Sequence, residues 1–246
     1  MQETRLILIR HGDPDYEHDS LTEIGFREAE CLGDRMAKMN ISEIYVSPKG
    51  RARATAEPTL RKAGKEAVTY DWLKEFTIPV KRPDKDGDDS RIPWDWLPED
   101  LNQAPELLDP VKWRMNPVFL DARVGEAYDE VVTQFDALLA SHGYVRDGLL
   151  YHVEKANTDT LAFFCHLGLA CLLMSHLINC SPMVLWQGTC LAPSSVTMIY
   201  TEERRPGIAM FRPQTIGDVS HLYMNGLEPS FAGRFCEVYG NGDRID

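Results

Sequence analysis

Two apolar segments of the chain end on a histidine. The segment "LILIRHG" places Arg10 and His11 after four apolar residues, and "LAFFCH" ends at His166. A third segment, "SPKGRARATAE", carries Arg51 in the predicted first turn of a helix. Guanidinium groups make paired hydrogen bonds to phosphate oxygens, and the amino end of a helix also attracts anions. These four side chains are therefore suited to form a small cationic pocket for phosphate, if the fold brings them together.

The elements that must position these residues are strands of a mostly parallel sheet. Residues 6–9 and 160–165 each read as a buried strand, because they are short, apolar and flanked by polar residues or glycine. The segment "SEIYV" is a third strand, and it leads directly into the helix that carries Arg51. Ligand sites in open α/β sheets lie beyond the carboxyl ends of the strands. If the first two strands are central and parallel, His11 and His166 leave the sheet at the same edge.

The rest of the chain predicts strands that alternate with helices. A capping-box pattern, Ser20 with Glu23, opens an amphipathic helix, and Ser47 with Pro48 is expected to open the next one, which ends at Gly64. A helical stripe follows in 125–143 and an apolar helix in 169–179, a hairpin signal occurs at 147–148, and two more strands are expected at 194–200 and 207–214. This order predicts an α/β fold: a three-layer α/β/α sandwich with helices on both faces of a mostly parallel sheet, in a single domain spanning 1–246.

One stretch, from about 77 to 124, interrupts the alternation. It holds seven of the fifteen prolines and three of the five tryptophans, Trp94, Trp96 and Trp113. Dense proline prevents long regular elements, whereas tryptophans would not lie in a free linker. We expect an ordered insertion that caps the domain. Its tryptophans form either a small core of their own or a lid over the substrate pocket.

Composition limits the partners. The formal charge of −12 argues against nucleic acid, which needs a basic surface, and no apolar stretch is long enough to span a membrane. The six scattered cysteines read as reduced core thiols, so a cytoplasmic enzyme is expected. Cys171, His176 and Cys180 do not share one helical face, and no metal site is predicted from them. The sequence leaves open whether the protein forms a homo-oligomer.

Six segments together resemble the motifs of the histidine phosphatase superfamily, with its phosphoglycerate mutase-like fold. In chain order they are "LILIRHG", "LTEIGFREAE", "SPKGRARATAE", "WLKEF", "GEAYDE" and "FFCHLG". The resemblance runs from Leu6 to about Tyr200 and is interrupted by the insertion. It implies a metal-independent phosphatase that needs no cofactor and acts on a small phosphorylated molecule.

The resemblance also implies roles for single residues. His11 would be the nucleophile that becomes a phosphohistidine, while Arg10, Arg51 and His166 would hold the phosphate oxygens as charge spreads over them. A leaving alkoxide needs a proton, and Glu75 in "WLKEF" matches the position of the family's acid. Glu126 in "GEAYDE" is the alternative acid, although it can also be read as a first-turn helix residue.

Departures from the family pattern bear on the reaction. Many members have Asn six positions after the nucleophile, where this chain has Glu17. The Thr-Gly segment with which mutases bind a carboxylate is absent, because "DPDYEHDS" runs almost directly into "LTEIG". The extra carboxylate at Glu17 would repel anionic substrates, and the absence of the Thr-Gly segment favours hydrolysis of a phosphomonoester over a mutase reaction. Two alternatives remain: a phosphoglycerate mutase-type phosphotransferase, and a catalytically silent module that binds a phosphorylated ligand.

Overall fold

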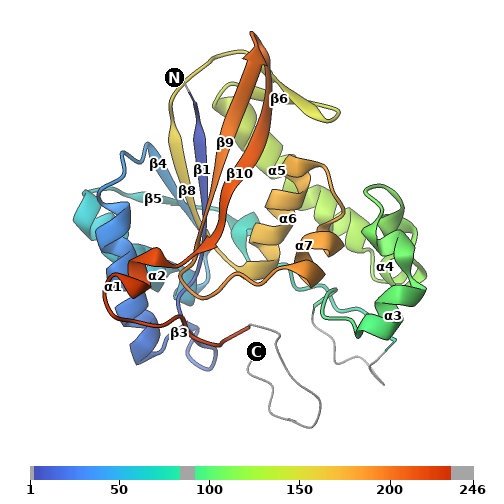
Figure 1. The fold of residues 1–246 in the computed structure, drawn as a ribbon, viewed down its shortest axis with the longest axis horizontal. Coiled ribbons are helices and arrows are strands. Elements are labelled where there is room, and N and C mark those ends of the chain that lie inside the picture. The colour runs from blue at the N-terminus through green and yellow to red at the C-terminus, as the bar shows by residue number, and fades with distance from the viewer. Residues whose placement is uncertain (1–2, 84–91, 234–246) are drawn as a thin grey trace.

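An eight-stranded sheet forms the centre of the computed structural model, which describes residues 3–83 and 92–233 (Figure 1). The strand order is β5-β4-β8-β1-β9-β10-β7-β6. The bounds are β1 (Arg5–Arg10), β4 (Glu43–Val46), β5 (Ala67–Thr69), β6 (Tyr144–Asp147), β7 (Leu150–Val153), β8 (Thr160–Cys165), β9 (Val196–Arg205) and β10 (Ile208–Asp218). Two very short strands, β2 (Pro14–Asp15) and β3 (Ser20–Leu21), pair with each other apart from this sheet.

The sheet is mixed, and the expectation of a mostly parallel sheet is corrected for its second half. Strands β5, β4, β8 and β1 are parallel to one another. Strand β9 runs antiparallel to β1, and the strands beyond it also pair in antiparallel fashion. Strands β9 and β10 are joined by only two residues, as are β6 and β7, and such tight connections can link only antiparallel neighbours.

Helices cover both faces of the sheet, as expected for a three-layer α/β fold. Alternate residues of β1 point to opposite faces, so that Leu6 and Leu8 belong to one buried cluster and Ile7 and Ile9 to another. The first cluster includes side chains of α5 (Val124–Ser141) and α6 (Leu167–Ile178). The second includes side chains of α1 (Glu23–Met36) and α2 (Gly50–Ala63). Figure 1 shows these two helix pairs on opposite sides of the strands.

Two helix starts differ from the prediction. Thr22, not Ser20, caps α1, because the Thr22 hydroxyl accepts a hydrogen bond from the Gly25 N–H at 3.1 Å. Helix α2 begins at Gly50, so Ser47 lies before the helix and its hydroxyl contacts His166 instead. The predicted end at Gly64 is confirmed, since this residue adopts a left-handed conformation with φ of 62°.

Short elements fill the insertion. They are α3 (Pro98–Gln103), α4 (Pro117–Asp121) and the 3-10 helices Pro105–Leu108 and Lys112–Met115. Its three tryptophans are buried, and all three belong to the cluster on the α5 and α6 side of the sheet. The described residues also form the 3-10 helix Asp71–Leu73 and the α-helices α7 (Pro182–Gly188) and α8 (Ser220–Tyr223). Within the described ranges, no helix has both the length and the apolar character required to cross a membrane.

Candidate active site

Three neighbouring parallel strands deliver the first site residues to one edge of the sheet. Strand β8 lies between β4 and β1, and the register pairs Arg10 of β1 with Cys165 of β8. The next residues along these strands, His11 and His166, therefore leave the sheet side by side. Their ring centroids are 5.1 Å apart, with an angle of 62° between the ring planes. The structure thus brings together the two histidines that the sequence singled out.

The ring of His11 is fixed by its neighbour. Nδ1 lies 2.8 Å from the carbonyl oxygen of Gly12, which can only accept, so Nδ1 carries the hydrogen and Nε2 keeps its lone pair. Burial lowers the pKa of His11 well below its usual value, and the positive charge of Arg10 lowers it further. His11 is therefore neutral at physiological pH, with its Nε2 available as a nucleophile.

His166 is fully buried and engaged at both ring nitrogens. Its Nε2 lies 2.8 Å from the hydroxyl of Ser47, and its Nδ1 lies 3.3 Å from Nη2 of Arg51. Burial is the main cause that lowers the pKa of His166, and the charges of His11 and Arg51 add to it. The ring is thus held in one orientation beside His11.

The two arginines flank the histidines from different elements. Arg10 ends β1, and its Nη1 donates to the carbonyl oxygen of Leu191. Arg51 lies in the first turn of α2, and its Nη1 donates to Asp19 at 2.7 Å. The Nε atoms of both arginines are buried and have no acceptor among the described residues. Buried donors of this kind are normally satisfied by a ligand or water, so the two guanidinium groups keep capacity to bind an anion.

Glu75 lies at the same place. Its carboxylate accepts hydrogen bonds from the backbone N–H groups of Gly168 at 3.3 Å and Leu169 at 3.0 Å, in the first turn of α6. Burial raises the pKa of Glu75, and the backbone N–H groups of Phe76, Leu169 and Gly168 oppose that rise only in part. A carboxyl group with a raised pKa can give up a proton to a leaving oxygen and later take one from water.

Glu126, the alternative acid, is placed elsewhere. It lies in the first turn of α5, its side chain is 61% exposed, and it pairs with Arg123. That pairing lowers the pKa of Glu126, which is opposite to what a proton donor needs. Glu126 lines a separate surface hollow together with Asp129 and Glu130. Of the two candidate acids, the structure brings only Glu75 to the histidines.

A cavity of about 530 Å³ is lined by Arg10, His11, Arg51 and Glu75, and His166 is buried behind His11. The insertion contributes one wall of it, and the segment before the carboxyl terminus contributes another. The lining residues are Arg10, His11, Tyr16, Arg51, Glu75, Thr77, Ile92, Trp94, Leu167 and Gly233. Cationic groups therefore lie beside an apolar wall, which suits a ligand with a phosphate at one end and an apolar part at the other.

Some supporting residues were not predicted from the sequence. Asp19 holds Arg51 and also accepts the Gly50 N–H at 2.8 Å, so it fixes the guanidinium and the start of α2 together. The positive φ of Asp19, 47°, directs this carboxylate, and no sequence pattern signals it. Ser47 was predicted, but as a helix cap. Its position at the end of β4, next to β8, is the feature that relates it to His166.

Glu28 is a second carboxylate that the sequence did not reveal. It is fully buried on α1, and it accepts the backbone N–H of Asp13 at 2.8 Å and that of Ser230 at 3.3 Å. Asp13 in turn accepts from the hydroxyls of Thr22 and Ser230. Burial raises the pKa of Glu28 to about 7, against the two backbone N–H groups, and the charge of Asp13 contributes to the rise. This network ties the loop after His11 to the segment that ends at Gly233.

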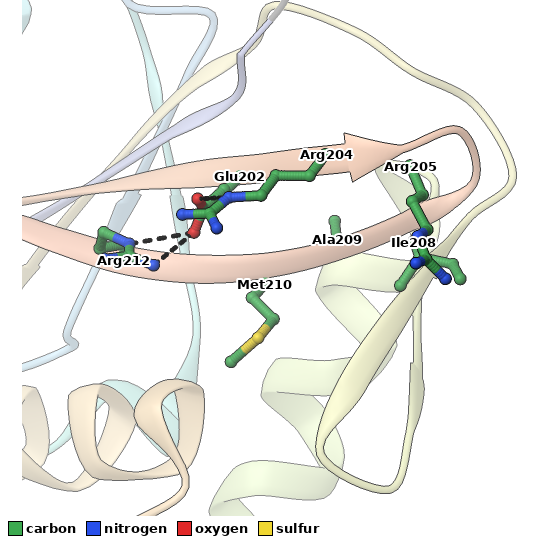
Figure 2. A pocket seen from close by; sticks show the side chains of 7 residues that line it. All are labelled: Glu202, Arg204, Arg205, Ile208, Ala209, Met210 and Arg212. Carbon is green, nitrogen blue, oxygen red and sulfur yellow. Dashed lines mark hydrogen bonds and ion pairs between the residues drawn. The ribbon is translucent and has the colours of Figure 1, made fainter.

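A different hollow, of about 280 Å³, lies on the β9–β10 hairpin (Figure 2). It contains none of the predicted site residues. Glu202 pairs with both Arg204 and Arg212, so these two guanidinium groups share one carboxylate within the hairpin. Among the described residues, no group of three or more His, Cys, Asp or Glu side chains is arranged to hold a metal ion.

Comparisons with known proteins identify the family and the fold of the chain. The family model of the histidine phosphatase superfamily (branch 1) matches residues 6–212, whereas no curated protein matches the chain in sequence. Among solved structures, a mycobacterial hydrolase is 18% identical with a TM-score of 0.57, covering 88% of this chain and 99% of its own. The phosphoserine phosphatase of Entamoeba histolytica in complex with phosphoserine is 20% identical with a TM-score of 0.55, covering 89% and 99%. A mycobacterial glucosyl-3-phosphoglycerate phosphatase with bound VO3 is 18% identical with a TM-score of 0.56, covering 87% and 98%. These structures share the fold, and the family match covers most of the chain: the protein belongs to branch 1 of the histidine phosphatase superfamily.

Proposed function

We propose that the protein hydrolyses phosphomonoesters of a small molecule through a phosphohistidine on His11. The observation that carries this proposal is the packing of the His11 ring against that of His166, 5.1 Å between the centroids, at a cavity that His11 lines together with Arg10 and Arg51. His11 has an unprotonated Nε2 there. Two of the three structural neighbours named above are phosphatases by description, and one of these is in complex with phosphoserine.

In the first step, Nε2 of His11 attacks phosphorus and the bond from phosphorus to the ester oxygen breaks. The new P–N bond takes its electron pair from the imidazole, while Glu75 gives its proton to the leaving oxygen. Arg10 and Arg51 bind non-bridging oxygens, whose negative charge redistributes in the transition state. His166 binds another by exchanging the contact of its Nδ1 with Arg51 for an Nδ1–H hydrogen bond to the oxygen, while the Ser47 hydroxyl donates to Nε2. The alcohol leaves, and its oxygen carries the proton from Glu75.

In the second step, water attacks the phosphohistidine from the side vacated by the alcohol. Glu75, now ionised, takes a proton from this water as the O–P bond forms and the P–N bond breaks. Neutral His11 is restored, inorganic phosphate is released, and Glu75 is protonated for the next cycle. The positive charge in both steps comes from the two guanidinium groups, so we expect turnover to need no metal ion.

The test is a panel of phosphomonoesters assayed with EDTA present, using wild type, His11→Ala and His152→Ala. His152 lies exposed on β7 and pairs with Asp147, so it controls for the loss of a histidine away from the cavity. We expect phosphate release by wild type and His152→Ala, an acid-labile phosphoryl group on the protein during turnover, and neither in His11→Ala. Activity that survives His11→Ala would overturn the mechanism, and loss of activity in EDTA would overturn metal independence.

The same assay separates the two alternatives. A phosphotransferase of the mutase type would move phosphate to an acceptor without net release of inorganic phosphate. A silent binding module would bind phosphate but turn over no ester in the panel.

A further inference from the structure

Trp94 is where the insertion reaches the cavity that holds His11. It comes from the segment 77–124, lines the cavity and is only 3% exposed. Its ring packs against Trp186 of α7, with 5.3 Å between the centroids. The indole is therefore held rigidly from behind while it forms part of the cavity wall.

The indole N–H of Trp94 is buried and has no hydrogen-bond acceptor among the described residues. Two neighbouring buried tryptophans differ in this respect. Trp96 donates its N–H to the carbonyl oxygen of Pro93 at 3.0 Å, and Trp186 donates to that of Gly168 at 2.8 Å. A buried N–H normally finds an acceptor, and leaving it unpaired costs about 1–3 kcal/mol. In a residue that lines a cavity, a bound ligand can supply the missing acceptor.

The position of Gly168 shows which part of a ligand Trp94 would meet. A methyl group at Gly168 would lie 2.1 Å from Cη2 of Trp94 and 2.9 Å from Oε1 of Glu75. The ring of Trp94 and the carboxyl of Glu75 thus converge on one point at the start of α6. Because Glu75 is the proposed proton donor to the leaving oxygen, the group attached to that oxygen lies next to Trp94.

We propose that Trp94 is a specificity-determining residue, which binds the alcohol part of the substrate through its ring face and its indole N–H. Ile92 and Leu167 extend the apolar wall beside it. The substrate class is then a phosphomonoester of a planar or apolar alcohol that carries a hydrogen-bond acceptor. This inference rests on the proposed function, because the place of the alcohol is defined by the roles of His11 and Glu75.

The experiment uses pairs of aryl phosphates that differ in the acceptor alone: methoxyphenyl against ethylphenyl phosphate, as the ortho, meta and para isomers. The two members of each pair have nearly the same size, and only the ether oxygen can accept a hydrogen bond. For at least one isomer, we expect wild type to prefer the methoxy member by about 2- to 10-fold in kcat/KM, mainly through a lower KM. In Trp94→Phe, which keeps a ring but removes the N–H, this preference should fall to one.

A second variant and a control distinguish a loss of ring contact with the substrate from a loss of folding. Trp94→Ala should lose at least about 10-fold in kcat/KM for the aryl phosphates and far less for glycerol 3-phosphate, which has no ring to contact. Trp96→Phe removes an indole N–H from the same insertion outside the lining of the cavity, and its substrate preference should equal that of wild type. Melting temperatures of all variants show that each is folded.

Three outcomes overturn the inference. If wild type prefers neither member of any isomer pair, or if Trp94→Phe keeps the preference of wild type, the indole N–H does not bind the substrate. If Trp94→Ala loses kcat/KM equally for the aryl phosphates and for glycerol 3-phosphate, the ring does not bind the substrate. In each case a wild type that still releases phosphate through His11 leaves the proposed function intact. A wild type that turns over no ester overturns the proposed function, and this inference with it.

Discussion

Glu28→Gln should change how the free energy of unfolding depends on pH. The Glu28 carboxyl is buried beneath the loop that follows His11, and its pKa is raised from 4.5 to about 7. Between these values the folded protein keeps a proton that the unfolded chain has released. The folded state therefore binds more protons, and the free energy of unfolding falls as pH rises through this window. The amide side chain of the variant cannot ionise, so this contribution disappears.

The magnitude follows from the two pKa values. At about 1.4 kcal/mol for each pH unit between 4.5 and about 7, ionised Glu28 costs about 3 kcal/mol of stability above pH 7. The single oxygen of an amide can replace only one of the two carboxylate oxygens that accept from Asp13 and Ser230. The variant therefore loses one hydrogen bond, which costs about 1–3 kcal/mol at every pH.

Urea unfolding of wild type and Glu28→Gln at pH 4.5, 5.5, 6.5 and 7.5, monitored by tryptophan fluorescence, gives the difference at each pH. We expect the stability of the variant relative to wild type to rise by about 3 kcal/mol across this range. Glu23→Gln, at an exposed position of the same helix, controls for the loss of one negative charge. A difference that stays constant with pH would refute the conclusion that burial keeps Glu28 protonated near neutrality.

Three further predictions concern the cavity. Glu75→Gln should lower kcat/KM for alkyl phosphates by about 10²- to 10⁴-fold and that for nitrophenyl phosphate much less, because kcat/KM reports the first step, in which only the alkoxide needs a proton; equal loss of kcat/KM on both would contradict the donor role. Ser47→Ala should lower kcat/KM by about 10- to 100-fold in steady-state assays, since Nε2 of His166 loses its partner at 2.8 Å, and an unchanged value would show that the ring needs no such support. Gly168→Ala should lower the melting temperature by roughly 2–12 °C in calorimetry, because its methyl group would overlap Trp94. Gly188→Ala, with nothing within 4 Å of the added carbon, is the matched control, and an equal shift in both variants would argue against the overlap.

The parallel half of the fold could be predicted because each of its strands is marked by residues that are adjacent in the sequence. Each strand that carries a site residue is a short apolar run, and His11 and His166 directly follow such runs. Two histidines that follow neighbouring parallel strands must lie close to each other, and β1 and β8 are such neighbours. The antiparallel half was missed as a whole, although one of its hairpins was predicted at residues 147–148, because the order of strands in a sheet depends on contacts distant in sequence.

The supporting residues could not be predicted, for a related reason. Asp19 reaches Arg51 across 32 residues, and Glu28 reaches Ser230 across 202. An isolated carboxylate in the sequence reads as solvated surface, and only the packing of α1 against the loop after His11 shows that Glu28 is buried. The choice between Glu75 and Glu126 likewise depended on position in space, since both lie in plausible motifs and only one lies beside the histidines.

The place of β8 in the sheet has a consequence for how the protein acquires its activity. Strands β1 and β4 are made early in the chain, yet in the sheet they are separated by β8, which follows about 100 residues later. Until β8 inserts, His11 and Ser47 have no His166 between them, and a nascent chain that ends before residue 160 can form at most a part of the proposed phosphate site. Insertion of a central strand closes a long loop and is slow for that reason. In refolding experiments, recovery of phosphatase turnover should therefore trail the recovery of helix signal, and it reports on completion of the sheet.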